Sequence, residues 1–137
     1  MSSTIIVDIV VGVNGSKEDA QLICDKKKIT IELLMRNGYR KSYSDHDFYK
    51  CFAKVREDHP DIVFYCKGAK VNVHTSSMSS QMSLGLKAYE LALGKTPSLD
   101  DVVYIFDYAE GELTNDYSVQ REFYMRWIKS EKPIDGE

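Results

Sequence analysis

Residues 68–94 read GAKVNVHTSSMSSQMSLGLKAYELALG, and the predicted fold is arranged around this stretch. Its first part, residues 71–74, alternates apolar and polar side chains and predicts a short strand. Three hydroxyl residues at 75–77 can then cap a helix N-terminus. A helix is expected to follow, because apolar residues recur at steps of three and four. These residues are Met78, Met82, Leu86, Tyr89 and Leu93.

The end of this predicted helix is marked by Gly94, which suits a left-handed C-cap, and by Pro97, which prevents continuation. Gly85 lies beside the apolar stripe, where a glycine costs roughly 1 kcal/mol relative to alanine. We therefore expect another segment of backbone to approach closely at Gly85.

The composition is that of one ordinary globular domain. The chain has 137 residues, 43% apolar and 28% charged, with a net charge of −3. We expect a single domain at 1–132 and a flexible tail at 133–137. No apolar run approaches the roughly 18 residues of a membrane span, and the run at 5–13 is a poor signal peptide. Three cysteines without CxxC spacing favour free thiols, and hence the cytoplasm.

The first half of the chain predicts mostly strands. Residues 4–11 are rich in β-branched side chains, and 16–20 form a polar connection or a short helical turn. Residues 21–25 and 29–35 are expected to pair as a hairpin around three lysines. The alternative is one helix over 16–35, which the β-branched run at 29–31 disfavours.

The second half predicts two more helices and further strands. One helix begins at Ser44 or Asp45 and ends near residue 58. Residues 62–66 and 71–74 are expected to form a hairpin. Residues 102–108 form another strand, and a short helix after Ser98 is possible. The last helix covers 118–130, with a predicted buried face of Val119, Phe123, Trp127 and Ile128.

These elements together predict an α+β fold, with a mostly antiparallel sheet and about three helices packed on one face.

Metal or cofactor chemistry has little support in the sequence. The histidines His46, His59 and His74 are not paired at helical spacing, and zinc-type cysteine spacing is absent. We expect no metal and no cofactor.

Two other functions remain as alternatives. Cys66 and His74 could face each other across the predicted hairpin and form the nucleophile and base of a small enzyme. The basic and aromatic residues within 26–41 could bind RNA, although the acidic net charge makes nucleic-acid binding unfavourable.

The charge distribution is most informative over residues 96–120, which hold six carboxylates and no lysine or arginine. Carboxylates alternate here with aromatic residues, which is typical of a protein-binding surface that attracts a basic partner. The predicted contact residues are Asp100, Asp101, Tyr104, Asp107, Tyr108, Glu110, Glu112, Asp116 and Tyr117.

A family resemblance points in the same direction. The segment CKGAKVNVHTSSMSSQMSLGLKAYELALGK, followed by DDVVYIFDY, resembles small bacterial immunity proteins of polymorphic toxin and contact-dependent growth inhibition systems. The likeness covers roughly residues 64–108, with Trp127 as a looser match. It implies a non-catalytic protein that binds and neutralises a cognate toxin domain. Because an acidic surface suits a basic cleft, we expect that toxin to be a nuclease.

Overall fold

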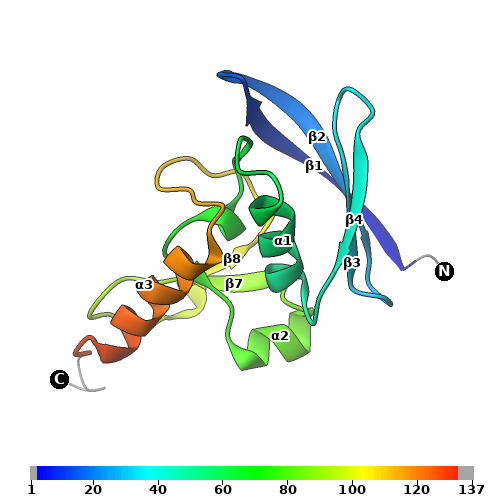
Figure 1. The fold of residues 1–137 in the computed structure, drawn as a ribbon. Helices are drawn as coiled ribbons and strands as arrows, with labels where there is room; N and C mark the ends of the chain where they lie inside the picture. The colour runs from blue at the N-terminus through cyan, green and yellow to red at the C-terminus, as the bar shows by residue number, and fades with distance from the viewer. Residues whose placement is uncertain (1–2, 133–137) are drawn as a thin grey trace.

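The computed structural model describes residues 3–132, so the tail expected at 133–137 lies outside the described part. The described chain folds into two antiparallel sheets and three α-helices, which confirms the α+β class (Figure 1). One curled sheet has the strand order β4-β3-β2-β1-β5, and the second has the order β6-β7-β8. The strands are β1 Thr4–Val13, β2 Ser16–Asp25, β3 Thr30–Leu34, β4 Arg40–Ser44, β5 Val63–Phe64, β6 Val73–His74, β7 Lys87–Glu90 and β8 Val102–Tyr104. The helices are α1 Phe48–Glu57, α2 Ser77–Ser83 and α3 Tyr117–Lys129, with short 3-10 turns η1 Lys67–Ala69 and η2 Leu99–Asp101.

Helix α1 contacts both sheets. It packs against β3 and β4, and the hydroxyl of Tyr49 donates to the carbonyl of Val73 in β6 at 2.7 Å. The predicted stripe of this helix, Phe48, Cys51, Phe52 and Val55, is fully buried. Helix α2 contacts β7 and α3 contacts β6, so the three helices are distributed over two sheets and not gathered on one face of a single sheet. None of the helices in the described residues is long and apolar enough to cross a membrane.

The long β1–β2 hairpin corrects one prediction. Residues 16–20 were expected to form a connection or helical turn, but they belong to β2 and pair along β1 to its end. The reason is the tight turn at Asn14 and Gly15, whose φ angles of 51° and 81° suit a two-residue hairpin. The β2–β3 hairpin is confirmed, and the alternative helix over 16–35 is excluded.

The organising stretch differs most from its prediction. Helix α2 ends at Ser83, and the chain then turns through Leu84 and Gly85, which have φ angles of 58° and 78°. Residues 87–90 form β7, the central strand of the second sheet, with Ala88 fully buried. The predicted helix is therefore confirmed only as far as Ser83, and its continuation over 84–93 is wrong. Met78 and Met82 are 68% and 81% exposed, so their helical spacing does not mark a core face.

The expected hairpin of residues 62–66 and 71–74 is also wrong. Strand β5 pairs with β1, whereas β6 pairs with β7 in the other sheet. The turn η1 carries the chain between them. Its Gly68 packs tightly, because an added Cβ would lie 2.8 Å from the Cβ of Ile105.

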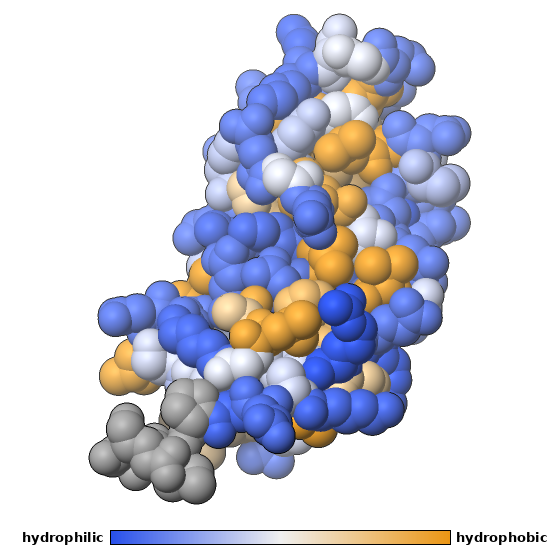
Figure 2. All heavy atoms as spheres, turned by 90° about the vertical axis from the view of Figure 1, so that its left-hand side faces the viewer, coloured by the Kyte–Doolittle hydropathy of each residue, from blue (hydrophilic) through white to orange (hydrophobic). Residues whose placement is uncertain are grey.

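The C-terminal elements differ from their predictions in length or in burial. Strand β8 ends at Tyr104, and the short helix after Ser98 is present as η2. In α3 the buried side chain is Gln120, which is 1% exposed, whereas Ile128 is 47% exposed. The predicted buried face of this helix is therefore wrong. Figure 2 views the α3 side and shows apolar side chains interrupted by polar ones.

Candidate functional site

The predicted acidic surface divides among three elements. Asp100 and Asp101 lie on η2, Asp116 caps α3, and the other three carboxylates lie on the connection between β8 and α3. Asp101 forms a capping box with Ser98 and an ion pair with Lys95 at 3.1 Å. The amide and hydroxyl of Ser118 donate to Asp116 at 2.8 and 2.6 Å. These two carboxylates therefore have structural roles.

Two of the three predicted tyrosine anchors are partly withdrawn from solvent. Tyr104 and Tyr117 are half-buried and pack against the hydrophobic core. Burial raises the pKa of Tyr104. Tyr108, by contrast, is 47% exposed. Tyr108 and three exposed carboxylates of the predicted surface thus lie together in residues 107–112, which we call the acidic loop, whereas the exposed Asp100 and Asp116 lie outside it.

The acidic loop is fixed at several points along its backbone. Its carbonyls at Asp107 and Glu112 accept hydrogen bonds from the amides of Lys67 and Val71 at 2.8 and 3.0 Å. The amide of Ala109 donates to the carbonyl of Tyr65 at 3.1 Å. The side chains of Asp107, Glu110 and Glu112 are all exposed. The loop therefore presents three carboxylates from an anchored backbone.

One lysine partly offsets this charge. Lys17, at the start of β2, donates from Nζ to the Tyr108 hydroxyl at 2.8 Å and lies 3.6 Å from Glu110. The Tyr108 ring stacks on Tyr65 with their centroids 5.9 Å apart. Both partners of the Lys17–Glu110 pair are exposed, so the attraction is screened and weak. The loop remains acidic overall.

The cysteine hypothesis is not favoured by the arrangement of the sheets. Cys66 follows β5 and His74 lies in β6, which belongs to the other sheet. Cys66 is fully buried, and burial raises the pKa of its thiol to about 12. Such a thiol carries almost no thiolate near neutral pH.

The basic region at 26–41 does not form one patch. Its three lysines lie in the β2–β3 turn, and the remaining basic residues begin in the β3–β4 turn, at the other end of β3. A five-residue strand separates the two turns by about 16 Å. Arg40 pairs with Glu32 and Lys41 with Asp58, which further reduces the free charge.

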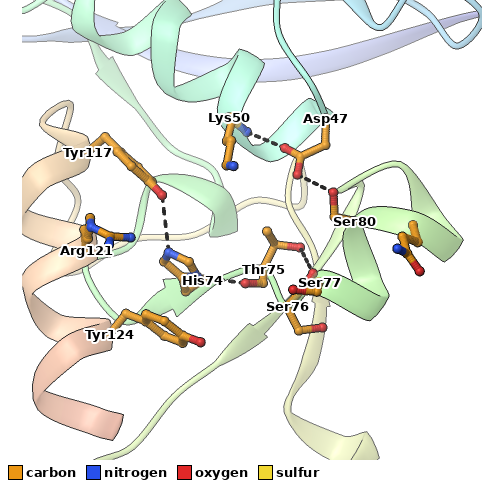
Figure 3. Close-up of a pocket in the computed structure, with 11 residues that line it drawn as sticks. Asp47, Lys50, His74, Thr75, Ser76, Ser77, Ser80, Tyr117, Arg121 and Tyr124 are labelled. Atoms are coloured by element: carbon orange, nitrogen blue, oxygen red, sulfur yellow. Dashed lines mark hydrogen bonds between the residues drawn. The ribbon is translucent and has the colours of Figure 1, made fainter.

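A pocket around His74 was not predicted. It has a volume of about 390 Å³ and lies where α1, β6, α2 and α3 meet (Figure 3). The pocket is lined by Asp47, Lys50, His74, Thr75, Ser76, Ser77, Ser80, Gln81, Tyr117, Arg121 and Tyr124. We call it the His74 pocket. Within residues 3–132, no group of three or more His, Cys, Asp or Glu side chains could hold a metal ion.

The His74 ring is held by its neighbours. Its Nδ1 lies 2.8 Å from the carbonyl oxygen of Thr75, so this nitrogen carries the proton and donates it. Its Nε2 lies 3.4 Å from the Tyr117 hydroxyl, which donates to it in the neutral tautomer. The ring stacks on Tyr124 with centroids 4.1 Å apart and planes 10° apart. Burial lowers the pKa of His74, and the positive charges of Arg121 and Lys50 lower it further.

Asp47 supports the wall of the pocket. Its carboxylate caps α1 by accepting from the amide of Lys50 at 2.8 Å, and it accepts from the Ser80 hydroxyl at 2.6 Å. The carboxylate is 2% exposed and thereby fastens α2 to the start of α1. Gly85 is approached closely here, but by a side chain and not by the backbone that is expected from the sequence: an added Cβ would lie 2.8 Å from the Cβ of Asp47.

The residues of the His74 pocket come from separated parts of the sequence. Only the run Thr75-Ser76-Ser77 was a local signal, and it was interpreted as a cap, which Ser76 indeed provides for α2. Nothing in the sequence near Lys50 or Arg121 indicates that they share a pocket.

Comparison of the chain with protein-family models and with curated proteins finds no match.

Proposed function

We propose that this chain is a non-catalytic immunity protein, which acts in the cytoplasm by binding a cognate toxin domain. We expect the toxin to be a basic nuclease. The observation that carries this proposal is the acidic loop, an anchored backbone with three exposed carboxylates beside the exposed Tyr108.

The backbone of the acidic loop is preorganised for binding. A loop whose backbone is already hydrogen-bonded loses little conformational entropy when a partner docks on it. The three carboxylates attract a basic surface over several ångströms and speed its association. Tyr108 offers an aromatic ring of the kind that dominates binding energy in protein interfaces.

The loop also borders a hollow that could receive a partner side chain. Glu110 and Glu112 line a cavity of about 310 Å³ together with Lys70, Val71 and Phe123. A lysine or arginine of the toxin entering this hollow would have two carboxylates and one aromatic ring nearby, which favour a cation, because the lysine of the lining, Lys70, is already paired with Glu90.

The test is a charge-neutral triple variant, Asp107→Asn/Glu110→Gln/Glu112→Gln. The matched control, Asp19→Asn/Glu57→Gln/Glu122→Gln, removes the same charge from exposed residues elsewhere. Each is co-expressed with the toxin domain encoded immediately upstream. We expect the loop variant to lose protection. At low salt its rate of association with the toxin should be lower than that of the wild type by about tenfold or more. Equal protection and equal association rates for the two variants would show that another surface is used.

A further inference from the structure

The His74 pocket carries an inference that is independent of the acidic loop. We propose that it binds a phosphate monoester, with Lys50 and Arg121 contacting the phosphoryl group. The structural basis is the convergence of two cations and several hydroxyls on one cavity of about 390 Å³ (Figure 3).

The two cations are free to bind an anion. Lys50 and Arg121 are exposed, and within residues 3–132 neither side chain takes part in an ion pair or hydrogen bond. The only carboxylate in the lining, that of Asp47, is buried and already accepts two hydrogen bonds. The solvent side of the pocket therefore has an excess of positive charge and of hydrogen-bond donors.

The protonation of His74 depends on this positive charge. Its ring lies close enough to Arg121 and Lys50 for both to oppose its protonation. A bound dianion would reverse that effect, and the protonated Nε2 could then donate to the anion in place of accepting from Tyr117. The ring is thus placed to become a third cationic donor when the ligand is bound.

The number and kind of donors favour phosphate over carboxylate. A guanidinium and an ammonium match the several oxygens of a phosphoryl group, and Arg121 can contact two of them at once. Hydroxyls of Ser76, Ser77 and Tyr124 also line the cavity. These donors exceed what the two oxygens of one carboxylate can accept.

The volume of the cavity indicates that the phosphoryl group is part of a larger molecule. A cavity of about 390 Å³ falls within the range of ligand pockets, roughly 300–1,000 Å³. The stacked rings of His74 and Tyr124 supply a flat wall for the organic part of the ligand. A phosphate monoester of a small organic molecule therefore fits better than free phosphate.

The experiment is an NMR titration of the full chain with phenyl phosphate, inorganic phosphate and acetate, each at matched ionic strength. We expect phenyl phosphate to shift the amides of Thr75, Ser76 and Ser77 and to raise the pKa of His74. Inorganic phosphate should act at the same residues but more weakly. If inorganic phosphate binds as tightly as phenyl phosphate, the organic part has no site and the monoester proposal is wrong. Equal binding of acetate, or no localised shifts with any probe, would also overturn it.

Substitutions then test the two cations. Lys50→Gln and Arg121→Gln should each weaken phenyl phosphate binding about tenfold or more, because each removes a charge-assisted contact. The matched controls are Lys129→Gln and Arg126→Gln, which change exposed residues of α3 outside the pocket lining. Equal weakening in the controls would mean that the effect comes from overall charge. All four side chains are exposed, so the variants should fold.

Discussion

Arg56 in α1 donates from Nη2 to the Oε1 of Gln120 in α3 at 2.7 Å, across 64 residues of sequence. Both side chains are buried. The side-chain amide of Gln120 also donates to the carbonyls of Gly68 and Lys70, at 2.9 Å each. Gln120 therefore joins α1, η1 and α3. Burial lowers the pKa of Arg56 to about 10, so its guanidinium still carries a charge at neutral pH.

Replacing Gln120 with leucine should strongly destabilise the protein. The substitution leaves the buried carbonyl of Gly68 and part of a buried guanidinium without hydrogen bonds, and the Lys70 carbonyl keeps only its bond from the Val73 amide at 3.2 Å. We expect the free energy of unfolding to fall by about 2–4 kcal/mol. Urea denaturation measures it, with Gln81→Leu on exposed α2 as the control that should stay within about 0.5 kcal/mol. If the free energy of unfolding falls as little in Gln120→Leu as in the control, the buried network contributes little to stability.

Gly85→Ala should be more damaging than Gly111→Ala. Both glycines have left-handed φ angles, 78° and 106°, so both alanines incur a backbone cost of about 1–2 kcal/mol. Only at Gly85 would the new Cβ collide with Asp47, at 2.8 Å, whereas Gly111 has nothing within 4 Å. Displacing Asp47 also weakens the α1 cap, which is worth about 1 kcal/mol. Thermal unfolding of the two variants measures the difference, and equal midpoints would disprove the clash.

Local sequence patterns correctly predicted the elements whose conformation depends mainly on nearby residues. The strand at 4–11, the β2–β3 hairpin and α1 follow from alternation, turn residues and a single apolar stripe. The helix predicted over the organising stretch is wrong beyond Ser83. Met78, Met82 and Leu86 satisfy a helical period, but Ala88 joins a sheet with β6 and β8. The local pattern there is overridden by pairing with strands that are distant in sequence, and a short window of sequence contains no information about such pairing.

The candidate sites show the same limit. Composition located the acidic loop, because its three carboxylates lie within six residues of sequence. It could not separate them from Asp101 and Asp116, whose capping roles depend on where η2 and α3 begin. The His74 pocket was missed because Lys50, His74 and Arg121 converge only through the packing of α1, β6 and α3.

The three cysteines should be unreactive in the folded protein. Cys24, Cys51 and Cys66 are fully buried, and burial raises their pKa values to about 12, 11 and 12. We expect a thiol reagent near neutral pH to label none of them until denaturant is added, and then all three. The labelling stoichiometry is read by mass spectrometry. Rapid labelling of Cys66 in the native state would revive the nucleophile hypothesis.

The stability of the ligand-free protein should fall as the pH drops from about 7 to about 5.5, and His74 should cause part of the fall. Burial, with Arg121 and Lys50, lowers its pKa below the ordinary value of 6.5, against the opposing effects of the hydrogen bond to Thr75 and of Asp47. The unfolded chain therefore takes up a proton at a higher pH than the folded chain does. Protonation in this window favours unfolding, and the contribution is present above pH 6.5 and lost as the pH falls through the folded-state pKa.

The measurement is urea denaturation at both pH values in a buffer without phosphate. One histidine contributes at most about 1.4 kcal/mol per pH unit. The free energy of unfolding of His74→Gln should show a shallower pH dependence than that of the wild type, whatever its absolute stability. The aromatic groups that face His74 are Tyr49, Tyr117 and Tyr124. An unchanged slope in His74→Gln would therefore show that this ring takes up its proton as easily in the folded protein as in the unfolded chain.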